Sequence, residues 1–341
     1  MHTQRLQPRD TAEAAEILRR GGLLGIPTET VYGLGANGLN PDAVGRIFAA
    51  KGRPQDNPLI LHIPSADWLE RYCGDIPDTA YALAERFWPG PLTMVLRRKR
   101  VVPDVVTAGL DTVGMRCPAH PVCRAILAAA DVPVAAPSGN TSGRPSPTNM
   151  ADMLEDMDGK IDGIVDGGPC AVGVESTIVD LTVMPPRLLR PGGVTLEQLR
   201  DALGEVAVDP AVTRLMGAGE QPRAPGMKYR HYAPKGKLIL IDGAPENVKA
   251  ALRARYAEEE ARGHKVCLLL PESMIPDFPN ARAYSLGGDL SEASHRVFAA
   301  LRQLDRDEIE VAFCQTFDTR GIGLALMNRL DRAAGFTIEK V

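Results

Sequence analysis

Four cationic side chains stand where a folded protein could place them against an anion. Lys51 and Arg53 lie two positions apart and are followed by Pro54, while Arg116 and Arg190 each end an apolar run just before a proline-containing turn. Arginine binds carboxylates and phosphates through two parallel N–H donors. A single Lys-x-Arg pair is typical of a solvated basic turn. Three arginines placed in this way in one domain predict a concave, positively charged site for a polyanionic small molecule.

A second stretch offers neutral donors. The apolar residues 132–136 lead into a loop rich in serine, threonine and glycine that extends to residue 148. Such a loop can present several backbone N–H groups and hydroxyls to an anion. Its order matches neither the phosphate-binding loop G-x-x-x-x-G-K-[ST] nor the hydrolase elbow G-x-S-x-G. Thr28 and Thr30 also follow a short apolar strand and are further candidates for ligand contact.

Residues 33–38 match G-x-G-x-x-G, the dinucleotide fingerprint. The fingerprint requires an uninterrupted strand before the glycines and a helix that opens among them. Here residues 27–30 interrupt the strand, and the next helix begins later, with Asn40 as its cap and Pro41 at its first position. We therefore predict no nicotinamide site at these glycines.

The elements that would position these residues alternate along the chain. Short apolar strands, helices and proline-rich turns predict an α/β catalytic domain over residues 1–208. Residues 209–236 lose this periodicity and predict an interdomain linker. Strand and helix patterns then alternate again over residues 237–341, which predicts a smaller, parallel α/β domain.

Composition excludes several classes of protein. The chain has 341 residues, of which 44% are hydrophobic and 24% charged, as in a globular protein of two domains. A net charge of −4 argues against a protein that binds nucleic acid over its whole surface, although the basic run 97–100 is a candidate RNA patch. Six scattered cysteines indicate neither a disulfide framework nor a zinc site. Without a long apolar segment or the apolar core of a signal peptide, we expect a cytoplasmic protein.

Together these stretches resemble the YrdC-type threonylcarbamoyl-AMP synthases. The shared motifs follow the family's order over essentially the whole chain, and Gly38 and Gly139 stand where the family pattern has alanine. Because both glycines lie in loops, we expect no change in chemistry. The motifs are Pro27–Gly35, Lys51–Pro54, Asn57–Leu59, Arg116–Pro121, Ala136–Asn140, Pro145–Thr148, Glu175–Thr177, Leu189–Gly192 and, as in the linker of the long members, Pro225–Pro234.

The resemblance implies both a fold and a reaction. The fold is a twisted mixed sheet with a concave basic cleft in the N-terminal domain, followed by a smaller Rossmann-like parallel α/β domain. The reaction is that of a nucleotidyltransferase, which converts L-threonine, bicarbonate and ATP into L-threonylcarbamoyl-AMP and pyrophosphate, with Mg²⁺ brought by ATP. The product would pass to the machinery that forms threonylcarbamoyladenosine in tRNA.

The same resemblance implies roles for particular residues. Lys51 and Arg53 would be the catalytic cations at the phosphates, and Arg116 would bind the threonine carboxylate. Tyr232 would reach over the nucleotide from a linker that acts as a lid. The full sets are Arg53, Asn57, Thr112, Ser138, Ser146, Arg190 and Tyr232 for ATP, and Thr30, His62, Arg116, the backbone at Ala136 and Ser176 for L-threonine.

Attack of a carbamate on a phosphate depends on positioning and positive charge, and it needs no strong general base. This agrees with a sequence that shows no His–Asp pair or paired carboxylates, and the ligands of Mg²⁺ are expected to be ATP oxygens and water. A protein that binds double-stranded RNA in ribosome maturation remains the first alternative, resting on residues 97–100. The second alternative is a carbamoyl-transferring maturation enzyme, which would carry zinc-finger or acylphosphatase modules, and the cysteine spacing of such modules is not found here. A nicotinamide dehydrogenase is the weakest alternative, because it would rest on residues 33–38 alone.

Overall fold

The computed structural model describes residues 2–214, 216–217, 222–227 and 231–341, and the chain divides into two compact units. Unit 1 comprises residues 1–142 and 146–229, and unit 2 comprises residues 143–145 and 230–341. The division falls inside the predicted linker 209–236, so the first part of that stretch packs with unit 1. Residues 228–230 of the linker motif lie outside the described residues.

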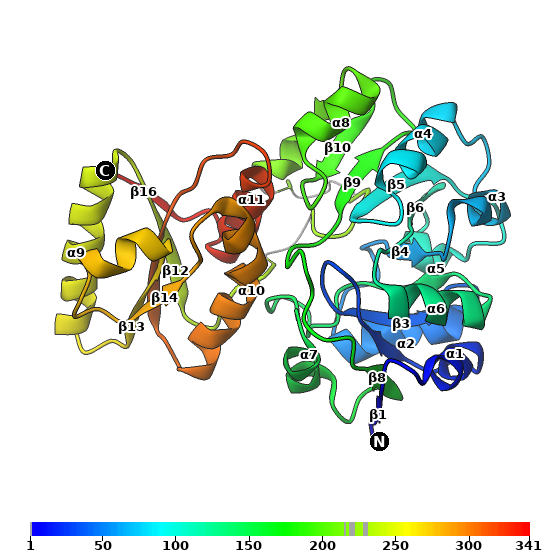
Figure 1. Cartoon of the computed structure of the whole chain (residues 1–341), viewed down its shortest axis with the longest axis horizontal. Helices are drawn as coiled ribbons and strands as arrows, with labels where there is room; N and C mark the ends of the chain where they lie inside the picture. The colour runs from blue at the N-terminus through cyan, green and yellow to red at the C-terminus, as the bar shows by residue number, and fades with distance from the viewer. Residues whose placement is uncertain (1, 215, 218–221, 228–230) are drawn as a thin grey trace. The chain divides into compact units, whose positions relative to one another are not determined.

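Unit 1 is built on one mixed sheet, which confirms the predicted fold class (Figure 1). In the described part of the chain its eleven strands lie in the order β1-β8-β2-β3-β7-β4-β6-β5-β9-β10-β11. Their bounds are β1 Gln4–Leu6, β2 Leu24–Ile26, β3 Gly33–Asn37, β4 Ile60–His62, β5 Leu92–Arg97, β6 Thr112–Arg116, β7 Val134–Ala135, β8 Gly163–Val165, β9 Thr177–Asp180, β10 Arg187–Arg190 and β11 Ala207–Val208.

Short helices connect these strands, and apolar faces fix them to the sheet. Ile17 and Leu18 pack with Ile126 and Leu127 against Ile26 of β2 in one continuous core, and the two helices that carry them lie side by side in Figure 1. The helices are α1 Thr11–Arg19, α2 Pro41–Lys51, α3 Leu69–Tyr72, α4 Asp78–Phe87, α5 Asp104–Thr107, α6 Pro121–Ala130, α7 Met150–Met157 and α8 Leu196–Leu203, with 3₁₀ turns η1 Ala66–Trp68 and η2 Pro210–Val212.

Helix α2 shows how local sequence places a cation. The Asn40 side chain accepts hydrogen bonds from the backbone N–H groups of Asp42 and Ala43, which caps the helix. Gly52 ends it in the left-handed conformation, at φ 61°. Lys51 is therefore the last residue of a helix with well-defined ends.

The glycine-rich residues 33–38 form strand β3 and the residue after it. Strand β3 pairs antiparallel with both β2 and β7, so these glycines do not form the turn that the dinucleotide fingerprint requires. Close packing explains Gly38, because a Cβ there would lie 2.5 Å from Leu61 and 2.9 Å from the Pro133 carbonyl oxygen. A Cβ at Gly139 would lie 2.7 Å from the Met153 side chain. Neighbouring side chains thus fill the space of the alanines expected at these two positions.

Unit 2 has a parallel sheet, as predicted, and helices cover both of its faces. Its strands lie in the order β14-β13-β15-β12-β16 in the described part of the chain, with α9 on one face and α10 and α11 on the other (Figure 1). The elements are β12 Lys237–Asp242, α9 Pro245–Ala261, β13 Val266–Leu270, η3 Glu272–Asp277, β14 Ala283–Ser285, α10 Leu290–Arg306, β15 Val311–Gln315, α11 Gly323–Ala333 and β16 Ile338–Lys340.

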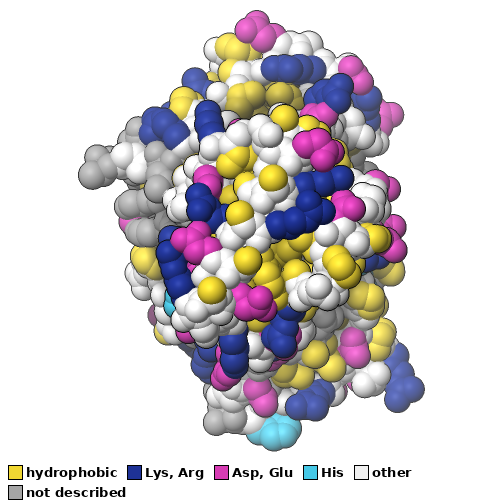
Figure 2. Space-filling model, turned by 90° about the vertical axis from the view of Figure 1, so that its left-hand side faces the viewer, with side chains coloured by type: hydrophobic (Ala, Val, Ile, Leu, Met, Phe, Trp, Pro, Cys, Tyr) yellow, Lys and Arg dark blue, Asp and Glu magenta, His cyan; other side chains and the backbone are white. Residues whose placement is uncertain are grey.

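Positive and negative side chains alternate on the face of unit 2 shown in Figure 2. Ion pairs account for this mixture on α9, where Arg255 pairs with Glu258 and Glu339, and Lys249 pairs with Asp277. Interspersed charges of both signs do not form the basic surface that nucleic-acid binding requires.

Residues 143–145 pack into unit 2 through polar contacts. The Ala233 N–H donates to the Gly143 carbonyl over 3.0 Å, and Arg302 Nη2 donates to the Pro145 carbonyl over 2.8 Å. Tyr232, also in unit 2, packs its ring 5.0 Å from that of Phe298. No described helix is long and apolar enough to cross a membrane.

Gly192, just after β10, lies very close to the backbone of the segment that leads into β9. A Cβ at Gly192 would lie 2.3 Å from the Glu175 carbonyl oxygen and 2.4 Å from the Thr177 nitrogen, and neither backbone atom can rotate away. We expect Gly192→Ala to lower the free energy of unfolding by about 1–3 kcal/mol, the usual cost of overpacking.

Gly45→Ala is the matched control, because a Cβ there meets nothing within 4 Å in the middle of α2. It should stabilise the protein by roughly 0.5–1 kcal/mol. Urea denaturation of both variants measures the difference, and a neutral Gly192→Ala would contradict the packing argument.

Candidate functional site

Five neighbouring strands bring polar side chains to one edge of the unit 1 sheet. His62 and Arg116 end the parallel strands β4 and β6 and are paired in register. Strand β5 runs the other way, so Thr93, near its start, lies opposite Arg116. Ser176 immediately precedes β9, which is parallel to β5, and Arg190 ends β10, which is antiparallel to β9. Alternating strand directions therefore place the ends of some strands beside the starts of others.

Arg116 is held by a carboxylate that the sequence analysis did not select. Its side chain is only 4% exposed, and its Nη2 donates to Glu29 Oε1 over 2.7 Å. Glu29 Oε2 accepts from the Ala119 backbone N–H over 3.0 Å. Among the described residues, Arg116 Nε has no hydrogen-bond partner. Such an orphaned buried donor is suited to a ligand acceptor.

His62 lies beside Arg116 and is neutral. Burial, followed by the positive charge of Arg116, lowers the pKa of His62 to about 3. Within the described part of the chain, its Nδ1 is buried without a hydrogen-bond partner. A neutral imidazole can orient a ligand by hydrogen bonding without adding a charge to the site.

Ser176 connects two of the other strand ends. Its hydroxyl lies 2.8 Å from Thr93 Oγ1 and accepts from Arg190 Nη2 over 3.2 Å. Arg190 Nε also donates to the Ser176 carbonyl over 3.1 Å. These bonds hold the Arg190 guanidinium against the start of β9, at the edge of the sheet that also carries Arg116.

The loop after β7 joins this edge through backbone contacts. The Ala136 N–H donates to the Ile60 carbonyl over 3.0 Å, and Ser138 forms a bridge with Gly33. Lys51 Nζ donates to the carbonyl oxygens of Ser138 and Asn140. The cation at the end of α2 thus holds the serine-rich loop in place.

Two buried hydroxyls complete the predicted set at this loop and at the loop after β2. Ser146 Oγ donates to Glu175 Oε1 over 2.7 Å, and Thr30 Oγ1 lies 2.9 Å from Thr28 Oγ1. Glu175, like Glu29, was not selected from the sequence. Both are acidic residues in otherwise buried segments, and this signal predicts a buried carboxylate that needs a partner.

Arg53 and Asn57 lie in the loop between α2 and β4. Arg53 Nη2 donates to the carbonyl oxygens of Asn57 and Pro58, over 3.3 and 3.2 Å. The Asn57 side chain is 1% exposed, and among the described residues neither its Oδ1 nor its Nδ2 has a partner. An amide buried in this way has both a donor and an acceptor available to a ligand.

Not every predicted residue of unit 1 lies at the polar edge. Thr112 starts β6 and is therefore at the opposite end of the strand from Arg116, where it lines a small recess with Pro58 and Arg223. The segment 222–227 covers this part of unit 1, since Ala224 packs in the same apolar cluster as Ile60. Tyr232 belongs to unit 2.

Two of the four cations in the basic run 97–100 pair with carboxylates of unit 1. Arg97 pairs with Asp111 and Arg98 with Asp104, while Lys99 donates to the Glu70 carbonyl. Because the charges of Arg97 and Arg98 are balanced in this way, the run gives the RNA-binding alternative less support than its sequence suggests.

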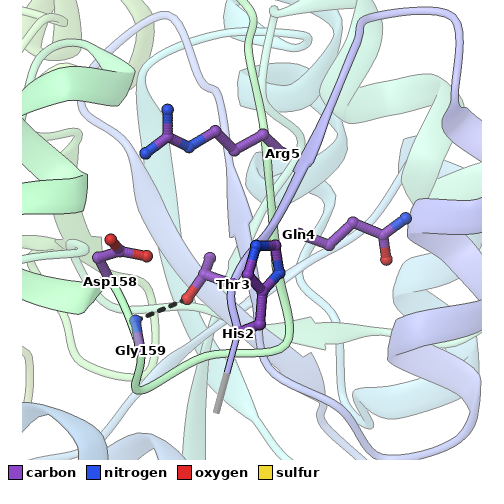
Figure 3. Close-up of a pocket in the computed structure, with 6 residues that line it drawn as sticks. All are labelled: His2, Thr3, Gln4, Arg5, Asp158 and Gly159. Atoms are coloured by element: carbon purple, nitrogen blue, oxygen red, sulfur yellow. Dashed lines mark hydrogen bonds between the residues drawn. The ribbon is translucent and has the colours of Figure 1, made fainter.

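A surface hollow beside β1 lacks a catalytic arrangement. It is lined by residues 2–5, Asp158 and Gly159. Figure 3 shows the side chains of Gln4, Arg5 and Asp158 pointing in different directions, with one hydrogen bond from the Gly159 N–H to Thr3 Oγ1. The thiols offer no nucleophile either, because burial raises the pKa of all six cysteines.

Comparison with known proteins gives matches over nearly the whole chain. The Sua5, YciO and YrdC family model, described as telomere recombination, matches residues 16–192, and the model of the threonylcarbamoyl-AMP synthase C-terminal domain matches residues 194–335. The threonylcarbamoyl-AMP synthase of Pyrococcus abyssi is 47% identical, over 96% of this chain and 95% of its own. That of Bacillus subtilis is 43% identical, over 95% and 92%.

Solved structures agree with these matches. The crystal structure of Pyrococcus abyssi Sua5 complexed with L-threonine covers 100% of both chains, at 44% identity and a TM-score of 0.94. The fold therefore matches that of a protein crystallised with an amino acid.

The neutral state of His62 predicts a pH dependence of stability. The unfolded chain titrates this residue near its usual value of about 6.5, whereas the folded pKa is about 3. The unfolded state therefore binds more protons between these values. We expect the free energy of unfolding to fall with decreasing pH in this window, by at most about 1.4 kcal/mol per pH unit from this residue.

His62→Gln removes the titrating group, so the pH slope between 6.5 and 3 should be shallower than in the unsubstituted protein. Urea denaturation at several pH values measures both slopes. Equal slopes in the two proteins would show that His62 does not contribute.

Proposed function

The chain belongs to the family of threonylcarbamoyl-AMP synthases and is an enzyme of that family, and from this premise we propose that it makes L-threonylcarbamoyl-AMP and pyrophosphate from L-threonine, bicarbonate and ATP. The observation that carries the proposal is the buried edge of the unit 1 sheet. There a carboxylate-paired arginine, a neutral histidine and a second arginine lie on consecutive or nearby strands.

L-Threonine would bind at the strand ends around Arg116. The orphaned Nε of that guanidinium suits the carboxylate of an amino acid, and His62 adds a neutral hydrogen-bonding group beside it. Thr30, Ser176 and the backbone at Ala136 would complete this site. The relative from Pyrococcus abyssi, crystallised with L-threonine, supports the proposal.

ATP would extend from this edge along the sheet. Lys51, Arg53, Ser138, Ser146 and Arg190 would surround its phosphates. The orphaned amide of Asn57 and the recess at Thr112 lie further along. Thr112 and Arg116 are four residues apart on one strand, about 13 Å, a span that a nucleotide can cover. Tyr232 is a further candidate for ATP binding, through the resemblance of the linker motif alone.

The proposed chemistry is transfer of an adenylyl group. The amine of threonine combines with bicarbonate to form a carbamate and water. A carbamate oxygen then forms a bond to the α-phosphorus as the bond to pyrophosphate breaks. Fixed positive charges stabilise this transfer without a strong general base.

Mg²⁺ would come with ATP. Among the described residues, no group of three or more His, Cys, Asp or Glu side chains could hold a metal ion. Nucleotide oxygens and water are the ligands that Mg²⁺ usually keeps in such sites, and the ion would neutralise phosphate charge there.

We also propose that the enzyme works in the cytoplasm and that its product passes to the tRNA threonylcarbamoyl transferase machinery. The names of the relatives support the product, and its labile mixed anhydride calls for an acceptor reaction that consumes it. The mixed charges on the face of unit 2 in Figure 2 and the ion pairs of Arg97 and Arg98 do not favour direct RNA binding over this proposal.

Pyrophosphate release from ATP tests the proposal directly. We expect release only when L-threonine and bicarbonate are both present, and loss of release when either is omitted. Arg53→Ala and Arg116→Ala should each lower kcat/KM by about 10- to 150-fold, because each removes a charge-assisted contact of about 1.5–3 kcal/mol.

Arg97→Ala is the control, since it removes a surface arginine that pairs with Asp111. It should leave turnover unchanged. ATP that stays intact under every combination of substrates would refute the proposed function.

A further inference from the structure

We propose that Glu29 is a positioning residue for the reaction, which aims the Arg116 guanidinium at the carboxylate of L-threonine. This inference rests on the proposed function, because it takes Arg116 as the carboxylate-binding group. Glu29 itself need not touch the substrate. Its role follows from what its two carboxylate oxygens hold.

Both oxygens of Glu29 bind the same short segment. Oε1 accepts from Arg116 Nη2 over 2.7 Å, and Oε2 accepts from the Ala119 N–H over 3.0 Å. Ala119 is three residues after Arg116, just before α6 begins at Pro121. One carboxylate therefore fixes the arginine side chain and the backbone that follows it.

The loop that carries Glu29 is itself anchored. Thr28 Oγ1 accepts from the Thr30 and Val31 N–H groups, each over 3.2 Å, and donates to the Val31 carbonyl over 2.6 Å. The Glu29 carbonyl accepts from the Val172 N–H over 2.7 Å. Because the backbone that carries Glu29 is fixed, its carboxylate is held at a defined position. The hydrogen bond to Arg116 then limits the orientation of the guanidinium.

Charge balance gives Glu29 a second effect on the site. His62 is neutral, so Glu29 supplies the negative charge that directly contacts the buried Arg116. This contact uses Nη2 and leaves Nε without a partner among the described residues. Without Glu29, the guanidinium would be free to turn toward other acceptors, and the substrate carboxylate would have to reorient it on binding.

Glu29→Gln separates this role from general stability. Glutamine keeps the length but presents one NH₂ group to two donors, so it loses the charge and at least one of the two bonds. We expect the KM for L-threonine to rise about tenfold or more, with the KM for ATP within about twofold of the original. Isothermal calorimetry with L-threonine alone should show a matching weakening.

Asp162→Asn is the matched control. Asp162 Oδ2 accepts from Arg46 Nη2 over 2.9 Å and from the Leu23 N–H over 2.7 Å, the same combination of one arginine and one backbone donor in unit 1. Its loss should lower the melting temperature and leave the threonine affinity unchanged. An equal loss of threonine affinity in both variants would reduce Glu29 to a general structural role and overturn the inference.

Glu29→Asp covers the case in which Glu29→Gln does not fold. Aspartate keeps the charge but is one methylene shorter, so it cannot reach both donors. The threonine KM should again rise while the KM for ATP stays close to its original value. If the folded variants bind threonine as tightly as the unsubstituted protein, the role of Glu29 is overturned while the proposed function stands. Failure of the unsubstituted protein to bind L-threonine would overturn the proposed function, and this inference with it.

Discussion

A guanidinium shielded from water, like that of Arg116, costs several kcal/mol unless its charge is balanced and its N–H groups are bonded. In unit 1 the balance comes from Glu29, on a loop 87 residues earlier in the chain. The end of β6, the loop after β2 and the start of α6 must therefore fold together around one ion pair. Arg116 also lies beside His62, because the parallel strands β4 and β6 pair in a register that places these two residues opposite each other. The polar edge of the sheet depends on this buried charge.

Much of this edge could be predicted from the sequence. A polar residue that closes an apolar run before a proline lies at a strand end, and this pattern selected Arg116 and Arg190. Alternation of strand and helix patterns gave the two α/β regions, and the family's motifs selected His62 and Ser176, both of which the structure places at the same edge. The contacts that these residues make with substrates remain predictions, because they depend on molecules that the chain does not contain.

Other features depend on pairings that no local pattern reveals. Glu29 and Glu175 bind residues 87 and 29 positions away, across a sheet whose strand order differs from the order in the chain. The run 97–100 reads as a basic patch until the fold brings Asp104 and Asp111 beside it.

The charges in this edge are fixed over the pH range in which proteins work. Arginine stays protonated, and burial keeps His62 neutral. Such a site gains little from moving protons and much from holding charges and dipoles in place before the substrates arrive. This arrangement is effective when negative charge moves between oxygens and no strong base is required. Lys51, at the end of α2, is held in place in a similar way, because its ammonium group donates to two carbonyls of the serine-rich loop. A cation that orders the loop also brings positive charge to the place where an anionic substrate would lie.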